Sequence, residues 1–294
     1  MPDAARPITV IGFIGLGVMG EPMCGHLARR SGREILGYDV RPEPLGRLAQ
    51  DGVKAATLET IADRADLILL SLPSSAAVEN VIGALLPRLK SGQCVVDTST
   101  TPVALTRHLG ERLGAADIAF ADSPVARTRE AASRGELSIM VGASDAVFAH
   151  LQPVLSTMGT DVTHCGPVGS GQVVKILNNM LLFQNVAALA EAIAIARRNG
   201  VSAETLLNTV ARGSGDSFAL RNHGMKSMMP RVYPERAFPT TYAIKDLAAA
   251  LEMAEAAGIA VEGARLTMRR LRAAEAAGHG AQYFPAMLEV IDPG

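Results

Sequence analysis

The sequence predicts an α/β fold in two parts. A doubly wound, Rossmann-type dinucleotide-binding domain is expected over residues 1–165, and an all-α domain over 166–294, entered through a long inter-domain helix. Three observations predict it: short β-rich runs alternate with helical patterns in the first half, a glycine-rich turn follows the first run, and the second half shows only helical patterns. A chain of 294 residues that is 48% hydrophobic is long enough to form two cores.

The expected strands of the first domain are short runs rich in β-branched and other apolar residues. They cover 8–14, 34–39, 66–72, 93–98 and 118–122, with further runs at 137–141 and 161–164. Helical patterns between them include 76–89, 103–113 and 146–158. This alternation predicts a parallel sheet that is covered by helices on both faces.

A Gly15-x-Gly17-x-x-Gly20 turn lies between the first expected strand and the first helix. This spacing suits a dinucleotide pyrophosphate: Gly15 permits the tight turn, Gly17 lets the backbone approach the phosphates, and Gly20 allows close packing of helix and strand. The alternative is a structural strand-to-helix turn that binds nothing.

Asp39 ends the second β-rich run. An acid at this position accepts hydrogen bonds from the adenosine ribose and repels a 2′-phosphate, which favours NAD over NADP. Arg41, two residues later, weakens this preference because it could accept a phosphate. The alternative for Asp39 is a turn-forming aspartate.

Two further segments close predicted strands and are candidates for the nicotinamide side of the cofactor. Leu72-Pro73 follows one strand, and Thr98-Ser99-Thr100 follows the next. Ligands of open α/β sheets bind at the carboxyl ends of the strands. The alternative is ordinary loop and helix-capping chemistry.

The second half begins at a Gly/Pro-rich segment, 166–171. A long helical pattern then runs over 172–198, and further helices are expected near 202–212, 240–257, 261–277 and 282–291. Pro230, Pro234 and Pro239 predict an irregular stretch between helices.

Lys175 is the strongest catalytic candidate. It lies near the start of the long helix, and a spacing of four places it on the same helical face as Asn179. The surrounding segment is nearly all apolar, so both side chains are expected to face a cleft. A partly desolvated lysine can exchange a proton near neutral pH beside a hydride transfer. The alternative is a surface lysine whose stem covers apolar residues.

Two other charged segments have an open interpretation. Arg127 and Thr128 follow the fifth expected strand and offer a planar fork and a hydroxyl for an anion, or else belong to a charged helix start. Lys245-Asp246 is either an exposed pair or a pair that reaches into a cleft.

The composition excludes several classes of partner. A net charge of −1 with 19% charged residues gives no basic surface for nucleic acid, and apolar runs such as 67–72 are too short for a membrane span. Residues 1–7 show no apolar core of an export signal. The widely spaced Cys24, Cys94 and Cys165 predict reduced thiols in a cytoplasmic protein and no metal site.

Taken together, these segments resemble the β-hydroxyacid dehydrogenase family, which includes 3-hydroxyisobutyrate dehydrogenase and the semialdehyde reductases. Phe13–Met23 resembles its cofactor fingerprint, Gly169–Asn179 its catalytic helix, and Lys245-Asp246-Leu247 its late Lys-Asp motif. The resemblance runs nearly end to end and implies a 6-phosphogluconate dehydrogenase-like C-terminal domain and burial of its helices in a homodimer or homotetramer.

The resemblance also implies roles for individual residues. Lys175 would donate or accept the proton, and Asn179, with Asn178 beside it, would hold the substrate. The implied cofactor contacts, in addition to the glycines and Pro73, are Val18, Met19, Asp39, Leu72, Thr100 and Lys245.

One segment departs from the family pattern. Members that act on simple carboxylates usually have Ser-Gly-Gly where this chain has Ala126-Arg127-Thr128, which is more similar to the Gly-Arg-Thr of 3-sulfolactaldehyde reductase. The expected reaction is NAD-dependent interconversion of a short β-hydroxyacid, or its sulfonate analogue, and a semialdehyde. The alternatives are an imine reductase, against which Lys175 counts, and an NAD(H)-binding sensor without turnover.

Overall fold

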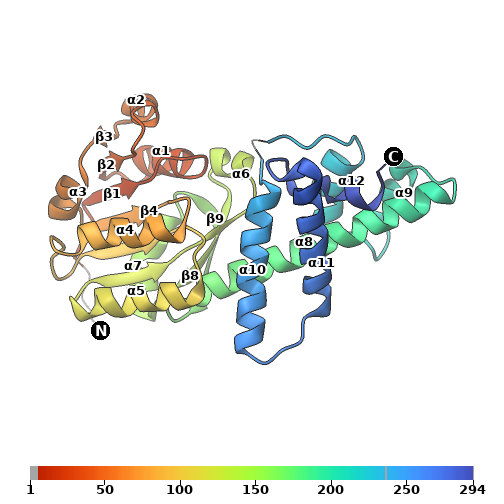
Figure 1. The fold of residues 1–294 in the computed structure, drawn as a ribbon. Helices are drawn as coiled ribbons and strands as arrows, with labels where there is room; N and C mark the ends of the chain where they lie inside the picture. Colours follow the sequence, from red (N-terminus) through yellow and green to blue (C-terminus); the bar gives the residue numbers. More distant parts are fainter. Residues whose placement is uncertain (1–5, 236, 294) are drawn as a thin grey trace. The chain divides into compact units, whose positions relative to one another are not determined.

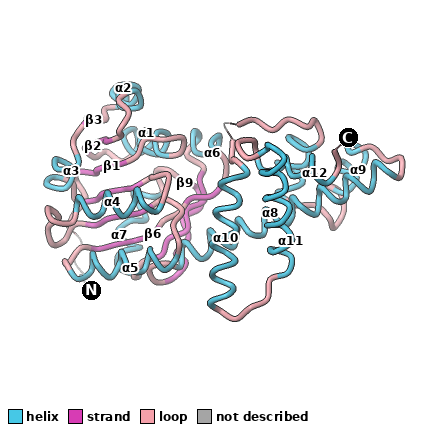
Figure 2. Tube along the Cα trace, viewed as in Figure 1, coloured by secondary structure: helices cyan, strands magenta, loops and turns pink. Residues whose placement is uncertain are grey.

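The computed structural model describes residues 6–235 and 237–293, so residues 1–5 of the segment searched for an export signal lie outside the described part. The chain divides into two compact units, the first ending at Lys175 and the second beginning at Ile176. Figure 2 shows the strands in the first unit and helices and loops in the second.

The first unit is built on a nine-stranded sheet in the described residues, with the order β3-β2-β1-β4-β5-β6-β8-β7 and β9 paired to β8. The neighbouring pairs from β3 to β6 are parallel, and β8 runs antiparallel to β6 and β7. The strands are β1 Val10–Ile14, β2 Glu34–Tyr38, β3 Lys54–Ala55, β4 Leu67–Leu70, β5 Cys94–Asp97, β6 Ala119–Asp122, β7 Val125–Ala126, β8 Leu137–Gly142 and β9 Gly159–Gly166. The prediction of a doubly wound sheet is therefore confirmed, although it included neither the two-residue strands β3 and β7 nor the reversal at β8.

Helices cover both faces of this sheet (Figure 1). One core joins Phe13 of β1 to Leu27 of α1 and Leu151 of α7, and the other joins β-strand residues to Ile61 of α3 and Ile82 of α4. The helices are α1 Gly20–Arg30, α2 Glu43–Leu48, α3 Leu58–Arg64, α4 Ser75–Leu85, α5 Val103–Ala115, α6 Arg129–Arg134 and α7 Asp145–Leu155.

The helix prediction for this unit was wrong at a boundary and incomplete. The helix expected over 76–89 ends at Leu85, because Pro87 has no N–H to donate to the carbonyl of Gly83. The helices α2 and α3 were not named in the prediction, since six or seven residues are too few to show a 3.6-residue period, whereas α6 is the charged helix start that the sequence left open at Arg127 and Thr128.

The second unit is helical in its described residues, apart from one isolated bridge between Pro239 and Tyr283. Its elements are α8 Ser170–Arg198, which begins in the first unit, α9 Ala203–Val210, the π-helical η2 Leu220–Met228, α10 Thr240–Ala256, α11 Glu262–Ala274, the π-helical η3 Glu275–His279, the 3-10 helix η4 Phe284–Met287 and α12 Leu288–Ile291. The single helix expected over 282–291 is divided into η4 and α12, with Pro285 in the first turn of η4. Aromatic rings of Phe183, Phe238 and Phe284 meet in its core.

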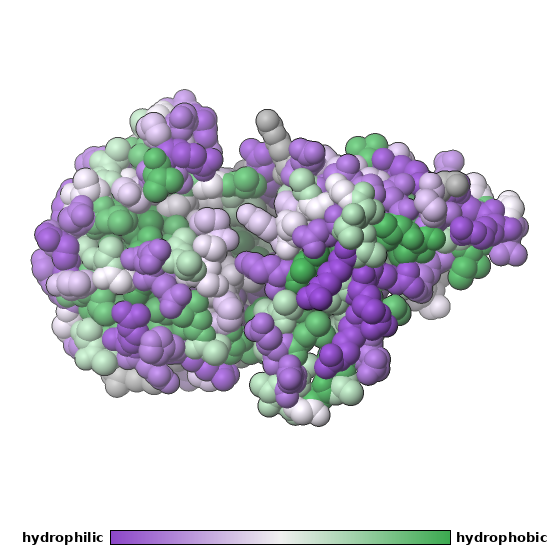
Figure 3. All heavy atoms as spheres, viewed as in Figure 1, coloured by the Kyte–Doolittle hydropathy of each residue, from purple (hydrophilic) through white to green (hydrophobic). Residues whose placement is uncertain are grey.

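The helix α8 corrects the expectation drawn from short apolar runs. Among the described residues it alone is long and apolar enough to cross a membrane, with a mean hydropathy of 1.5 over its best window, 44% of which is buried. Length and composition are weak evidence, since core helices of other proteins pass the same test. Figure 3 shows hydrophobic residues reaching the surface of the second unit among hydrophilic ones.

Candidate active site

The glycine turn before α1 has the geometry that a phosphate-binding turn requires. Gly15 has a φ of +93°, and a Cβ on it would lie 2.3 Å from the carbonyl oxygen of Ser71. A Cβ on Gly20 would lie 1.9 Å from the carbonyl oxygen of Gly15, so this glycine lets α1 start directly against the turn. By contrast, a Cβ on Gly17 would meet nothing within 4 Å. The open space at Gly17 and the start of α1 fit the pyrophosphate of a dinucleotide.

Asp39 is tied to this turn. Its Oδ2 accepts a hydrogen bond from the N–H of Leu16 at 2.7 Å, and its Oδ1 accepts bonds from the backbone N–H and Nε of Arg41 at 2.9 and 3.3 Å. Burial opposes ionisation of Asp39, but the hydrogen bonds from Arg41 and Leu16 outweigh burial and hold its pKa below the usual value. A negative charge therefore stands where β2 ends, beside the turn.

The carboxyl ends of β4 and β5 are joined by side-chain hydrogen bonds. The N–H of Leu72 donates to Oγ of Ser99 at 2.9 Å, and Oγ1 of Thr98 donates to the carbonyl of Leu70 at 2.6 Å. Leu72 and Thr100 are half-buried and Pro73 is exposed. The two segments proposed for the nicotinamide side thus form one connected edge, with Ser99 as its link.

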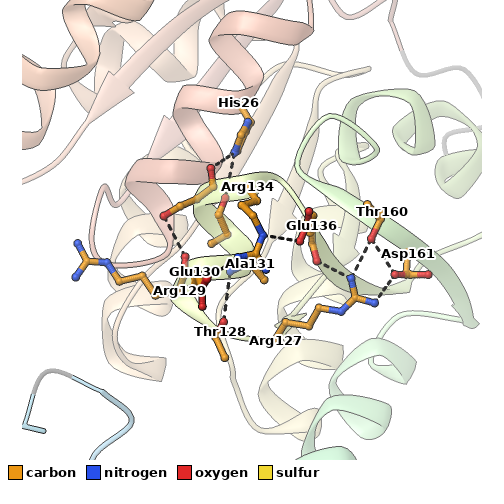
Figure 4. A network of polar contacts seen from close by, with 12 residues as sticks. His26, Arg127, Thr128, Arg129, Glu130, Ala131, Arg134, Glu136, Thr160 and Asp161 are labelled. Atoms are coloured by element: carbon orange, nitrogen blue, oxygen red, sulfur yellow. Dashed lines mark hydrogen bonds and ion pairs between the residues drawn. The ribbon is translucent and has the colours of Figure 1, made fainter. Parts of the chain in front are cut away.

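Arg127 is engaged by neighbouring residues of the first unit (Figure 4). Its Nη1 donates to the carbonyl of Glu136 at 2.6 Å and to Oγ1 of Thr160 at 2.9 Å, and its Nη2 pairs with Oδ2 of Asp161 at 2.5 Å. The side chain stays 39% exposed. To bind a substrate anion, this guanidinium would have to leave Asp161 for the anion or contact both at once.

Thr128 serves as the N-cap of α6, the ordinary role that the sequence left open. Its Oγ1 accepts a hydrogen bond from the N–H of Ala131 at 3.3 Å (Figure 4). The hydroxyl proton is not used by that bond and can still be donated to an anion.

Lys175 and Asn179 lie one turn apart on α8, and their environments differ. Lys175 is half-buried, Asn178 is exposed, and Asn179 is buried. The Nδ2 of Asn179 donates to Oδ2 of Asp246 at 2.8 Å, and the Nδ2 of Asn178 donates to Oδ1 of Asn179 at 3.2 Å. Asn179 is therefore held in one orientation from α10.

The Lys-Asp motif of α10 has one exposed and one buried member. The side chain of Lys245 is 49% exposed and that of Asp246 is 5% exposed, and Nζ of Lys245 lies 3.7 Å from Oδ1 of Asp246. Asp246, which the sequence placed in the Lys-Asp pair without a role of its own, thus orients Asn179. The signal for it was its position beside Lys245 on the inner face of a helix.

A second residue missed from the sequence is Asp122, at the end of β6. Its Oδ1 accepts the N–H of Gly169 at 2.6 Å and its Oδ2 accepts the N–H of Gln172 at 2.8 Å. The side chain of Gln172 continues this contact, since it donates to the carbonyl of Ser99 at 2.8 Å and accepts the N–H of Thr101 at 3.2 Å. These bonds attach the start of α8 to the edge of the sheet.

Comparisons with known proteins agree with this fold. Residues 10–166 match the family model of the NAD binding domain of 6-phosphogluconate dehydrogenase, and residues 169–291 match that described as NAD-binding of NADP-dependent 3-hydroxyisobutyrate dehydrogenase. The chain is 33% identical to 2-(hydroxymethyl)glutarate dehydrogenase of Eubacterium barkeri over 284 residues, which is 95% of this chain and 94% of that protein. It is 34% identical to the mitochondrial 3-hydroxyisobutyrate dehydrogenase of Mus musculus over 84% of this chain and 76% of that protein.

Solved structures share the fold. The 3-hydroxyisobutyrate dehydrogenase of Mycobacterium tuberculosis, solved with L-serine, superposes with a TM-score of 0.87 at 27% identity, over 97% of this chain and 99% of that one. An imine reductase from Pseudomonas sp. is 20% identical with a TM-score of 0.62 over 97% of this chain and 99% of that one, and this likeness shows the fold alone.

The Rossmann-type domain with its glycine turn, followed by the helical domain, defines an NAD(P)-dependent oxidoreductase. More closely, the chain belongs to the β-hydroxyacid dehydrogenase family, and its general activity is that of a hydroxyacid dehydrogenase.

Proposed function

We propose that this enzyme interconverts a short β-hydroxyacid, or its sulfonate analogue, and the corresponding semialdehyde, with NAD as its cofactor. The observation that carries the proposal is the arrangement on α8, where a half-buried Lys175 lies one turn before an Asn179 that Asp246 orients. A lysine and a fixed amide are the groups needed to hold and protonate a carbonyl oxygen.

Lys175 is the general acid and base of this proposal. When a hydroxyacid is oxidised, its hydroxyl proton passes to Nζ of Lys175 as the carbon gives up a hydride; in reduction, Nζ returns the proton to the oxygen. A nicotinamide cofactor bound at the first unit would supply the acceptor or donor of that hydride. Asn179, with Asn178 beside it, donates or accepts hydrogen bonds that fix the substrate relative to Lys175.

The cofactor is proposed to lie along the edge of the first unit. Gly15, Gly17 and Gly20 supply the turn, and Asp39 supplies the acceptor for ribose hydroxyls. The charge of Asp39 favours NAD, although the name of the matching second domain mentions NADP and Arg41 lies beside that acid. The remaining proposed contacts are Val18, Met19, Leu72, Pro73, Thr100 and Lys245.

A substrate with an anionic group away from the reacting carbon is the proposed ligand of Arg127 and Thr128. One relative is named for a hydroxymethyl derivative of glutarate, a dicarboxylate, which agrees with such a second anion. The guanidinium of Arg127 would give up part of its contact with Asp161 to reach it.

We further propose a cytoplasmic homodimer or homotetramer without nucleic-acid or membrane partners. Three free cysteines support a reducing compartment. The exposed apolar side chains of α8 support burial against a second copy: Val174, Leu177, Leu181 and Ile195.

The first experiment is NADH oxidation with a panel of sulfolactaldehyde, succinic semialdehyde, tartronate semialdehyde and methylmalonate semialdehyde. We expect turnover with at least one of these, and loss of about 10²- to 10⁴-fold in kcat for Lys175→Ala, because proton transfer is removed. NADH titration, followed by fluorescence, serves as the control for a folded cofactor site.

The result has a clear alternative. If NADH binds but no aldehyde of the panel is turned over, the proposed substrate class is wrong. That result would favour the alternative of an NAD(H)-binding sensor without turnover. If Lys175→Ala keeps wild-type turnover, the proposed proton-transfer mechanism is wrong even where the substrate class is right. A matching profile with NADPH would reject the preference assigned to Asp39.

A further inference from the structure

The start of α8 lacks the side chain that usually caps a helix. The residue before it is Gly169, which has no side chain, and its φ of +94° suits glycine. The N–H groups of a first helical turn have no partner within the helix. Here two amides at the helix start, those of Gly169 and Gln172, donate to the carboxylate of Asp122 at 2.6 and 2.8 Å.

We propose that Asp122 is a positioning residue for the reaction: its carboxylate caps α8 from the end of β6 and thereby fixes Lys175 one turn further along. The inference rests on the proposed function, because it assumes that Lys175 transfers the proton. Asp122 itself acts through α8, and no contact with substrate is assigned to it.

Two glycines make room for this carboxylate. A Cβ on Gly171 would lie 2.8 Å from Oδ2 of Asp122 and 2.3 Å from the carbonyl oxygen of Met140. A Cβ on Gly142, the register partner of Asp122 in β8, would lie 2.3 Å from Oδ1. The carboxylate is therefore enclosed between α8 and β8, and Asp122 is fully buried.

The enclosure leaves Asp122 few ways to move. Gln172 adds a second attachment of the same helical turn to β5 and the loop after it, through Ser99 and Thr101. The start of α8 is thus held by two hydrogen bonds from backbone amides to Asp122 and by two hydrogen bonds of the Gln172 side chain. These bonds keep Lys175, one turn later, in a narrow range of positions. That precision matters for proton transfer, where displacement of about 1 Å can cost roughly 100-fold in rate.

The charge of Asp122 makes the inference testable by pH. Burial raises its pKa to about 6, although the N–H groups of Gly169 and Gln172 lower it and the neighbouring Asp97 raises it further. The titratable groups around it are Asp97 on β5 and Cys165 on β9, while Arg107 of α5 packs on Gly169 and Lys175 follows on α8. Protonation would turn one acceptor oxygen into a donor and cost α8 one of its two bonds.

The test is Asp122→Asn in the full chain, measured with the best aldehyde of the panel. We expect kcat to fall roughly 10- to 100-fold with the Kd for NADH unchanged. The wild-type kcat should fall as pH drops through about 6, and this limb should be absent in the variant. Hydrogen exchange of the amides over 169–175 should be faster in Asp122→Asn and unchanged in Lys175→Ala.

Two further variants keep the test decisive if Asp122→Asn folds poorly. Gly171→Ala should also lower kcat without changing the Kd for NADH, whereas Gly83→Ala should behave as wild type, because a Cβ on that exposed helical glycine meets nothing within 4 Å. An unchanged kcat and acid limb in Asp122→Asn would overturn the proposal. Equal loss of NADH binding and of turnover in Asp122→Asn and Gly171→Ala would also overturn it, because Asp122 would then support the fold in general and would not position Lys175. Full activity of Lys175→Ala would instead reject the proposed function, while the exchange data would still report on the cap.

Discussion

Two helices of this protein, α1 and α8, begin at a Gly-x-Gly turn, and the two turns differ in the negative charge that they can bind. Gly15 before α1 and Gly169 before α8 have nearly the same left-handed backbone, with φ of +93° and +94°. The second glycines differ: Gly17 faces open space, whereas Gly171 faces the carboxylate of Asp122. The first turn is open to an external anion, and the second already holds one that belongs to the protein.

This difference separates binding from positioning. An open helix start can accept the phosphates of a cofactor, which come and go. A helix start closed by a buried aspartate accepts no ligand there, and its hydrogen bonds serve to hold α8 on the sheet. The same local sequence pattern thus supports two functions, and the residue that distinguishes them is far away in the chain.

The largest effect that should separate the two turns is the pH dependence of stability. The folded pKa of Asp122 is raised from 3.8 to about 6, so its contribution to the free energy of unfolding is complete below about pH 3.8 and is lost as pH rises through 6. The difference between these two pKa values corresponds to roughly 3 kcal/mol in the free energy of unfolding. Asp39, beside the open turn, has a lowered pKa and should act in the opposite direction. Its contribution to the free energy of unfolding is lost as pH falls through its folded pKa.

Urea unfolding of wild type and Asp122→Asn between pH 3.5 and 7.5 measures this effect. The wild type should lose stability relative to the variant as pH rises, although its activity should increase over the same range. A difference in stability that does not change with pH would mean that folding does not shift the pKa of Asp122, and the raised pKa assigned to this buried carboxylate would be wrong. Asp97 is present in both proteins, so its own titration largely cancels.

A smaller effect is expected from an added methyl group at the second glycine of each turn. Gly17→Ala should leave the free energy of unfolding within about 0.5 kcal/mol of wild type and weaken NADH binding, because the methyl group stands where phosphates approach. Gly171→Ala should destabilise by about 1–3 kcal/mol through overpacking and leave NADH binding unchanged. Calorimetry measures the stability of both variants, and fluorescence titration measures their affinity for NADH. The predicted difference between the two turns is wrong if both variants lose NADH affinity equally.

The sequence predicted the open turn well and the closed one only in part. Gly15, Gly17 and Gly20 are local in the chain, so their spacing is enough to place them between a strand and a helix. The partner of the second turn is Asp122, which lies 47 residues before Gly169 and comes to it through the pairing of β6 with β8 and of β8 with β9. No periodicity in a single sequence encodes that meeting. The hydrogen bond between Asn179 and Asp246, 67 residues apart, was not predicted for the same reason.

The smallest expected change in stability concerns Arg127, which stands at a third left-handed position. Its φ is +82°, a conformation that costs a non-glycine residue on the order of 1 kcal/mol, and the family pattern noted above has glycine there. Arg127→Gly relieves this strain and removes a solvent-exposed ion pair with Asp161, whose contribution to stability is kept small by solvent screening. The two effects nearly offset each other, so the thermal midpoint should change little.

Substrate discrimination should respond more clearly than stability. If Arg127 binds the distal anion, Arg127→Gly should raise KM for an aldehyde that carries a second charged group, and Asp161→Asn should lower KM because it releases the guanidinium from its partner. Arg129→Ala is the matched control, since this arginine of the same segment points away from Asp161 (Figure 4). An unchanged KM in both Arg127→Gly and Asp161→Asn would assign Arg127 to the attachment of α6 to β9, and the distal anion would need another ligand.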